Sequence, residues 1–345
     1  MRKYLLFFLF VQKAAFSLSV TVVGGGPAGL ASAIEASSKG FKVTLVEKRN
    51  SYSRNRPIAL LPNVLKILKE WNLKMLEIPM CEQSKQEASK WSFSGDESFT
   101  SMQRIDLIEK KLIKKCEELG VDRICGDFQR FGSEQTVYVK TEDGERVFSY
   151  DILIGADGLH SKVRELLSIQ MNDLGFAKAA YLVLPFSDFG MASLKMILIM
   201  KKDFDFLRII KVLPFVTIIS AQSSLEGSKD RIKDLLEAFG WTKEFKAIEE
   251  GKDVECVEDI FITLSQAETF SSFEKSVVLL GDAVASGSFL LGIGLNTAIL
   301  SKEILGEFLI EWKEDKEKAF QNFNRSMKGI TDKLIECNKS LFREF

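Results

Sequence analysis

Apolar runs and amphipathic stretches alternate along the first part of the chain. Residues 19–23 (SVTVV) form a continuous apolar and β-branched run, which is typical of a strand buried inside a parallel sheet. Residues 27–39 then carry apolar side chains at three- and four-residue spacing, which predicts an amphipathic helix. A second apolar run follows at 42–46. The order strand, helix, strand predicts a βαβ unit and therefore an α/β fold with a parallel sheet.

The later apolar pattern predicts a second sheet and a helical carboxyl end. Residues 178–220 alternate short apolar stretches with charged residues, which indicates a group of strands. Residues 228–239 fit an amphipathic helix, and residues 260–265 fit a returning strand. Residues 300–345 are rich in Lys and Glu at helical spacing, and we interpret the charge run 311–318 as a solvated helix face.

Composition narrows the class of protein without identifying it. The 345 residues are 46% hydrophobic and 28% charged, so a globular protein is expected. A chain of this length predicts two domains, or one domain with an insertion. The formal net charge is −1, which argues against a general nucleic-acid-binding surface, so no nucleic-acid partner is expected.

Cysteine and histidine content set further limits. Five widely spaced cysteines favour free thiols in a reducing compartment, which indicates the cytoplasm. The chain has one histidine, His160, so a histidine-rich metal site is excluded and no metal is predicted. The G-x-S-x-G pattern of one class of serine hydrolase is absent from the sequence, so that class is not expected.

The amino terminus has two interpretations. A basic start precedes the apolar run 4–11, and Ala15 and Ser17 fit the small residues of a cleavage site, so residues 1–17 resemble a secretory signal. The alternative is an uncleaved extension that packs on the body or contacts a membrane surface through residues 4–16. The run is too short to span a membrane, which takes about 20 apolar residues.

The first predicted strand continues directly into a glycine-rich turn that reads G-G-G-P-A-G. In this G-x-G-x-x-G pattern, Gly24 permits the tight turn, Gly26 lets the backbone approach a pyrophosphate, and Gly29 lets the helix pack on the strand. The helix start, which includes Ala28, offers unpaired N–H groups to phosphates. Glu47 ends the second strand and suits a ribose hydroxyl. Together these parts predict a dinucleotide site.

Two later motifs again combine a buried strand, a glycine and an acid. Residues 152–154 lead into a D-G pair, and the apolar run 277–280 leads into a G-D pair. An acid at the end of a buried strand can bind a ribitol or ribose hydroxyl, and a glycine-rich helix start can hold a phosphate or flavin edge. The cofactor contacts predicted here are Asp157, Gly158, Gly281, Asp282, Gly292, Gly294 and Asn296.

In this order, the motifs resemble the single-component FAD-dependent aromatic hydroxylases of the p-hydroxybenzoate hydroxylase type, over roughly residues 19–330. The resemblance implies non-covalent FAD, with Asp282 on its ribitol side and Arg104 in contact with it. It also implies NAD(P)H as a transient reductant. One oxygen atom of O2 would reach a small aromatic or other apolar substrate through a flavin hydroperoxide. No acid or base stands out, so the catalytic residues remain unknown.

One segment resembles a particular branch, the flavin domains of MICAL proteins and kynurenine 3-monooxygenase-like relatives. The resemblance rests on E-K-R at 47–49 and S-R-N at 53–55. In those domains this run lines the FAD site. By position, the expectation extends from Glu47 to Lys48, Arg49, Arg54, Asn55 and Arg56.

The resemblance weakens after the G-D pair. The family has Ala-Ala-His and a proline-rich turn there, near the point where oxygen reacts, whereas this chain reads AVASGSFL at 283–290. Two alternatives therefore stay open. One is a related FAD oxidoreductase that reduces or desaturates a lipid-like substrate, and the other is a flavoprotein scaffold without turnover.

The predicted architecture is a Rossmann-type FAD-binding domain with an interleaved β-sheet substrate domain and a helical tail. The predicted segments are a signal or hydrophobic extension at 1–17, a discontinuous FAD-binding domain at 18–170 and 270–310, a substrate-domain sheet at 171–269, and carboxyl-terminal helices at 311–345.

Overall fold

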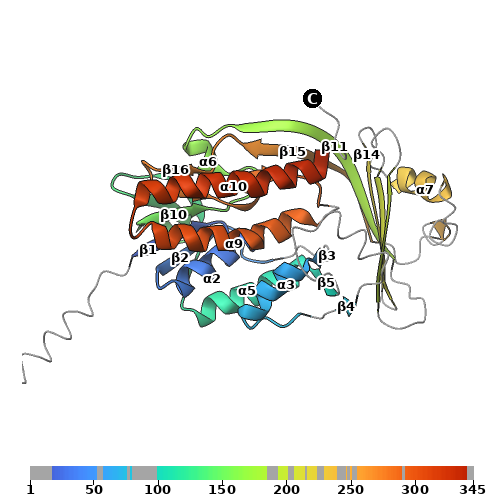
Figure 1. Ribbon diagram of the computed structural model, residues 1–345, viewed down its shortest axis with the longest axis horizontal. Helices are drawn as coiled ribbons and strands as arrows, with labels where there is room; N and C mark the ends of the chain where they lie inside the picture. The colour runs from blue at the N-terminus through green and yellow to red at the C-terminus, as the bar shows by residue number, and fades with distance from the viewer. Residues whose placement is uncertain are drawn as a thin grey trace, which may run out of the picture.

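A six-stranded, mainly parallel sheet forms the centre of the computed structural model (Figure 1). Its order is β16-β17-β10-β1-β2-β6; β17, β10, β1, β2 and β6 are parallel, and β16 pairs antiparallel at one edge. Val20 of β1 lies opposite Ile152 of β10 and Val43 of β2, so three apolar runs that are distant in sequence share one register. The strands are β1 Ser19–Val23, β2 Lys42–Glu47, β6 Asp122–Cys125, β10 Ile152–Gly155, β16 Ser271–Ser272 and β17 Val277–Leu279.

The structure describes part of the chain in detail. The described residues are 18–52, 57–75, 78–79, 99–184, 193–200, 206–213, 216–223, 229–238, 246, 249–250, 255–289 and 292–339.

Helices pack beside this sheet. Figure 1 shows α9 and α10 lying side by side, and α2 packs between α9 and α5 and against β1 and β2. The Ala-rich sequence of α2 permits this close packing, because nine of its twelve residues are buried. The helices are α2 Pro27–Ser38, α3 Pro62–Glu70, α5 Ile105–Glu118, α6 Lys162–Leu166, α9 Ile293–Glu311 and α10 Lys316–Lys339.

A second six-stranded sheet has the order β12-β13-β14-β11-β15-β18, and each pair of neighbouring strands in it is antiparallel. The long strands β11 and β15 pair with each other and run from the helical part of the molecule toward β14 (Figure 1). The strands are β11 Met171–Leu184, β12 Ser193–Met200, β13 Phe206–Leu213, β14 Val216–Ser223, β15 Glu255–Ala267 and β18 Ala285–Ser286, and helix α7 Lys229–Ala238 packs against β11 and β14.

Smaller elements complete the description. Strands β7, β8 and β9 form an antiparallel sheet that contacts β1 and β2, and β5 pairs with both β3 and β4. Their bounds are β3 Pro57–Leu60, β4 Ile78–Pro79, β5 Phe99–Arg104, β7 Asp127–Phe131, β8 Thr136–Thr141 and β9 Gly144–Ser149, and a 3-10 turn, η1, spans Gly281–Ala283.

The predicted α/β class and its parallel sheet are confirmed. The helix predicted over 27–39 ends at Ser38, and Gly40 follows it with φ +83°, a conformation that glycine adopts without strain. The predicted returning strand at 260–265 is longer, because pairing with β11 extends it to Glu255–Ala267. Within the described residues, no helix is both long enough and apolar enough to cross a membrane.

Candidate nucleotide-binding site

Three loops meet at one edge of the central sheet, because β1, β10 and β17 are parallel and end together. Ala156 N–H donates to Val23 O at 2.8 Å, and Leu280 N–H donates to Gly155 O at 2.9 Å. The loop after β1 is so close to the loop after β10 that a Cβ atom on Gly24 would lie 2.2 Å from Ala156 O. The predicted glycine turn, D-G pair and G-D pair therefore lie side by side.

The glycines of the first turn meet different surroundings. Gly24 has φ +103°, and a Cβ atom on Gly29 would lie 1.8 Å from Gly24 O, so turn geometry and close packing require these two glycines. A Cβ atom on Gly26, in contrast, would have Arg49 Nη2 as its one neighbour within 4.0 Å among the described residues. Gly26 precedes the first turn of α2, which begins at Pro27 and has no side-chain cap. This open helix start, with its unpaired N–H groups, suits a pyrophosphate.

Glu47 is held in place beside the glycine turn. Its Oε2 accepts a hydrogen bond from Gly25 N–H at 2.6 Å, and its Oε1 accepts from Arg49 N–H at 2.8 Å. The Arg49 guanidinium donates to both carboxylate oxygens at 3.0 Å. Burial would raise the pKa of Glu47, but the bonds from Arg49 and Gly25 outweigh it, so the pKa lies below its ordinary value. Glu47 is therefore an ionised acceptor at the predicted ribose position.

Tyr52 is a site residue that sequence analysis missed. Its hydroxyl is buried and has no hydrogen-bond partner among the described residues, and a Cβ atom on Gly25 would lie 2.6 Å from it. The Arg49 guanidinium lies 5.0 Å from the centre of the Tyr52 ring. Burial, together with the charge of Glu47, raises the pKa of Tyr52 to about 12, so the phenol stays protonated. An unpartnered O–H donor therefore points into the surroundings of Glu47 and Gly25.

Arg104 ends β5 and immediately precedes α5. Its guanidinium donates to both oxygens of Asp106, at 3.0 and 3.1 Å, and Lys110 lies 3.3 Å from the same carboxylate. The Arg104 side chain is 54% exposed, so much of its guanidinium is accessible. Lys48 is also exposed. The predicted contacts Arg54, Asn55 and Arg56 lie outside the described residues.

The D-G pair organises the start of α6. Asp157 accepts hydrogen bonds from the Ser161 hydroxyl and from Val163 N–H, the latter at 3.1 Å. Burial raises the pKa of Asp157 above its ordinary value. Gly158 follows with φ +91°, where no Cβ atom would meet a neighbour within 4 Å. The Asp157 carboxylate thus fixes the shape of this loop.

Arg164 is a second residue that sequence analysis did not assign to the site. Its guanidinium donates to Leu159 O in the D-G loop and to Ala283 O in the G-D turn, both at 2.9 Å. Its partner Ala283 is 119 residues away along the chain, so local sequence patterns do not reveal this connection. One side chain therefore joins two of the three loops.

The G-D turn lies against the start of α9. Asp282 is exposed, and a Cβ atom on Gly294 would lie 3.9 Å from Asp282 Oδ1. Gly292 has φ +68° and caps the amino end of α9. Asn296 is buried, and its amide accepts from Leu61 N–H at 2.8 Å and donates to Ala59 O at 2.9 Å. The Asn296 side chain thus anchors β3 to α9.

The residues present fit a dinucleotide with an extended, anionic centre. Within the part of the chain that the structure describes, the position at Gly26 leaves room at a helix start and the Tyr52 hydroxyl lacks a partner. Asp282 and Glu47 supply carboxylates at two separate loops of the same sheet edge. Among the described residues, no group of three or more His, Cys, Asp and Glu side chains could hold a metal ion. The arrangement therefore supports phosphate and hydroxyl recognition.

Sequence comparisons identify related proteins. A family model described as "FAD binding domain" matches residues 106–319, more than half of the chain. A second, described as "Pyridine nucleotide-disulphide oxidoreductase", matches residues 18–177. The human [F-actin]-monooxygenase MICAL2 is 30% identical over 159 residues, which are 42% of this chain and 7% of that protein. The FAD-dependent monooxygenase OpS4 of Beauveria bassiana (strain ARSEF 2860) is 28% identical over 179 residues, 46% of this chain and 41% of that protein.

Solved structures share the fold at low identity. The tetrameric form of 2-methyl-3-hydroxypyridine-5-carboxylic acid oxygenase superposes with a TM-score of 0.69 at 19% identity, covering 92% of this chain and 89% of that chain. The flavin-dependent brominase Bmp2 gives a TM-score of 0.67 at 17% identity, covering 90% and 83%. The chain spans less than half the length of both curated relatives, and the two solved structures show its fold.

Proposed function

This chain belongs to the FAD-binding domain family, and on that premise we propose that it is an FAD-dependent monooxygenase. It takes reducing equivalents from NAD(P)H and delivers one oxygen atom of O2 to a small aromatic or other apolar substrate. The observation that carries the proposal is the meeting of the glycine turn, D-G pair and G-D pair at one sheet edge. The related FAD-dependent monooxygenases support the class of reaction.

The proposal assigns parts of FAD to parts of the site. The pyrophosphate lies at the open start of α2 beside Gly26, and the adenosine ribose lies at Glu47. The G-D turn takes the ribitol side through Asp282. FAD supplies the redox and oxygen chemistry when bound, and the protein supplies orientation and electrostatics. The full proposed contact set is Gly24, Gly26, Ala28, Gly29, Glu47, Lys48, Arg49, Arg54, Asn55, Arg56, Arg104, Asp157, Gly158, Gly281, Asp282, Gly292, Gly294 and Asn296.

Tyr52 joins this set from its geometry. Its buried hydroxyl is a protonated donor, so it can donate to a ribose or phosphate oxygen but cannot repel one by charge. Arg49 lies over the same ring and is held by Glu47, which orients its guanidinium next to Gly26. A positive group and a neutral donor thus flank the place proposed for the anionic cofactor.

A second candidate function has a specific observation in its favour. The segment 283–290 lacks the histidine and prolines of the resembled hydroxylases. A related FAD oxidoreductase that reduces or desaturates a lipid-like substrate would not need an oxygen-handling turn there. A flavoprotein scaffold without turnover is a third candidate, and it rests on the same difference between segment 283–290 and the resembled hydroxylases.

Consumption of NADH and NADPH by the purified, FAD-loaded chain separates these candidates. The assay is run with and without a panel of aromatic compounds, with O2 uptake and hydrogen peroxide measured in parallel. The proposal expects nicotinamide oxidation that a substrate accelerates, accompanied by an oxygenated product. Oxidation with a reduced or desaturated product supports the second candidate, and stable FAD with no nicotinamide oxidation supports the scaffold.

A further inference from the structure

The carboxyl end of α10 reaches the loop that joins two parts of the proposed cofactor site. This loop, residues 284–289, follows the G-D turn and leads toward the glycine-rich start of α9. Asn338 of α10 is 1% exposed, and its Oδ1 accepts a hydrogen bond from Ser288 N–H at 2.9 Å. Its Nδ2 donates to Leu334 O, one turn earlier, at 2.7 Å. Both polar ends of a buried amide are therefore used in one fixed orientation.

Gly287 makes this contact possible. A Cβ atom on Gly287 would lie 3.0–3.1 Å from three atoms of the Asn338 amide, which is tighter than an ordinary contact. The loop therefore carries glycine where α10 approaches most closely. Any larger residue would push the loop away from the helix.

The opposite side of the loop is fixed to the second sheet. The Ser286 hydroxyl lies 2.8 Å from the Ser265 hydroxyl and donates to Thr263 O at 3.0 Å. Ala285 pairs with Gln266 in the β15–β18 ladder, and Ala267 N–H donates to Val284 O at 2.7 Å. The loop thus lies between β15 and α10.

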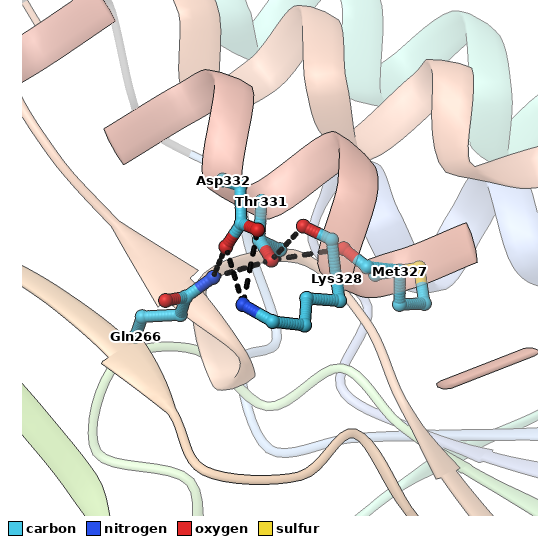
Figure 2. A network of polar contacts seen from close by, with 5 residues as sticks. All are labelled: Gln266, Met327, Lys328, Thr331 and Asp332. Carbon is cyan, nitrogen blue, oxygen red and sulfur yellow. Dashed lines mark hydrogen bonds and ion pairs between the residues drawn. The ribbon is translucent and has the colours of Figure 1, made fainter. Parts of the chain in front are cut away.

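A polar network then ties α10 to β15 directly (Figure 2). Gln266 Nε2 donates to Thr331 Oγ1 and Asp332 Oδ1, both at 2.8 Å, and Lys328 holds the same carboxylate at 3.0 Å. Figure 2 shows these side chains of α10 converging on Gln266. Because Gln266 is the ladder partner of Ala285, the network and Asn338 hold the same stretch of chain at two points.

The space between the loop and α10 is nearly filled. A cavity of about 10 Å³ lies among Val284 and Ala285 of the loop, Thr297 of α9, and Met327 and Leu334 of α10. A volume this small holds about one water molecule at most. A shift of α10 is therefore transmitted to the loop instead of being absorbed by empty space.

We infer that Asn338 is a positioning residue for the cofactor site: it sets the position of loop 284–289, and through it the spacing between Asp282 and the start of α9. This inference rests on the proposed FAD site. The hydrogen bonds of the Asn338 side chain go to Ser288 and Leu334, neither of which is a proposed cofactor contact, so it acts through Ser288 and the loop backbone. The helical tail is then part of the apparatus that holds the flavin side of FAD.

The chain offers a matched control on the same helix. Asn324 Oδ1 accepts from Phe270 N–H at 3.1 Å, and its Nδ2 donates to Phe320 O, one turn earlier, at 3.0 Å. Asn324 therefore makes the same two kinds of bond as Asn338, but to the segment before β17 instead of to the loop. It also accepts from the Thr269 hydroxyl at 3.3 Å and donates to the Ser271 hydroxyl at 2.7 Å, so its loss removes more hydrogen bonds than the loss of Asn338 does. Substitution of either residue by alanine should lower thermal stability, whereas only one should change FAD binding.

The test compares Asn338→Ala, Asn324→Ala and Asn338→Asp by FAD titration, the visible absorbance and circular dichroism of bound FAD, and thermal unfolding. Asn338→Ala should raise the Kd for FAD about fivefold, because FAD must then order the released loop, at a cost of up to the contribution of one hydrogen bond, and it should alter the spectrum. Asn324→Ala should stay within about twofold of wild type. Asn338→Asp keeps the acceptor for Ser288 N–H, so it should keep the wild-type spectrum even if it unfolds at lower temperature.

The following results decide whether Asn338 positions the cofactor site. Equal changes in Kd and spectrum for the two alanine variants, or no change in either, overturn the positioning role. A spectrum of Asn338→Asp that matches Asn338→Ala also overturns it. These readouts need only bound FAD. A wild-type chain that binds FAD but oxidises neither NADH nor NADPH therefore contradicts the proposed function, and the test of Asn338 can still be carried out. A wild-type chain that binds no FAD overturns both.

Discussion

Single residues decide whether the edge of the central sheet can hold an anionic cofactor. Gly24 and Gly29 are demanded by packing, whereas Gly26 stands beside open space. Glu47 and Tyr52 sit around the same turn, one as an ionised acceptor and one as a protonated donor. The separate contributions of Gly26, Tyr52 and Glu47 can be measured, because each residue has a substitution that changes one property.

Gly26→Val should abolish FAD binding without unfolding the protein. The backbone at Gly26 has φ −74° and ψ −177°, which valine adopts without strain, and of the described side chains a Cβ atom there meets Arg49 alone, at 4.0 Å. The valine side chain would instead occupy the approach of the pyrophosphate. The Kd for FAD and the thermal unfolding midpoint are measured together. Gly329→Val is the control, since a Cβ atom at Gly329 of α10 meets nothing within 4 Å. Tight FAD binding by Gly26→Val would contradict the placement of the pyrophosphate.

Tyr52→Phe should act with opposite signs on stability and binding. It removes a buried hydroxyl that has no partner, so the free energy of unfolding without FAD should rise by about 1 kcal/mol. If the hydroxyl donates to FAD, the Kd should rise about fivefold. The control is Tyr150→Phe, because Tyr150 Oη donates to Lys275 O at 3.1 Å. Chemical unfolding and FAD titration should show that this control loses stability and keeps its affinity. An unchanged Kd for Tyr52→Phe would remove Tyr52 from the site.

Glu47 should give stability that disappears in acid. Its pKa in the folded chain lies below the ordinary value of 4.5, so the folded state binds its proton more weakly than the unfolded state does. The stabilisation is therefore complete above pH 4.5 and is lost as the pH falls through the folded pKa. The free energy of unfolding, measured at each pH across this range, should change less with pH for Glu47→Gln than for the wild type. Identical slopes in both proteins would mean that the Glu47–Arg49 pair does not form in solution.

At the scale of elements, parallel strands bring the three loops to one edge, and side chains then connect them. Arg164 of α6 joins the D-G loop to the G-D turn through two backbone carbonyls. Asn296 of α9 joins that helix to β3, and Asn338 of α10 joins the tail to loop 284–289. The parallel strands of the sheet bring the three loops close together. Side chains of the helices then fix the distances between the loops.

Arg164→Met should loosen the connection between the D-G loop and the G-D turn. The methionine keeps the aliphatic part of the side chain but leaves two carbonyl groups without their donor, which costs about 1–3 kcal/mol. We expect a lower unfolding midpoint and a several-fold weaker affinity for FAD. Arg130→Met is the control, since Arg130 forms an exposed pair with Glu145, and such pairs contribute little. Equal effects of the two substitutions would mean that the connection does not matter for the site.

The sequence allowed the central sheet and its three motifs to be predicted, because each depends on a local pattern. The run SVTVV, the glycine turn and Glu47 are close neighbours along the chain, and the structure places them as one unit. Tyr52, Arg164 and Asn338 escaped prediction for a different reason. Their roles depend on partners that folding brings near, such as Ala283 for Arg164 and Ser288 for Asn338. The roles predicted for individual cofactor contacts stay predictions.

At the scale of the whole molecule, the second sheet and the helical tail converge on the loop that follows the G-D turn. Strand β15 pairs with β18, and α10 contacts both of them. Movement of the second sheet on substrate binding would therefore reach the cofactor site through this loop. Oxidation of NADH or NADPH should then be slow in the absence of substrate and faster when substrate is bound. This is the behaviour expected of an enzyme in which one nucleotide-binding domain holds FAD and also binds NAD(P)H transiently.

We propose that this chain uses FAD and NAD(P)H to insert one atom of O2 into a small apolar molecule. This is tested by a reaction of the FAD-loaded chain with NADPH or NADH, a panel of aromatic compounds and isotopically labelled O2, followed by mass spectrometry of the products. We expect a product that carries one labelled oxygen atom and is formed only when nicotinamide is consumed. Rapid nicotinamide consumption that yields only unlabelled reduced or desaturated product, or only hydrogen peroxide across the whole panel, would contradict it.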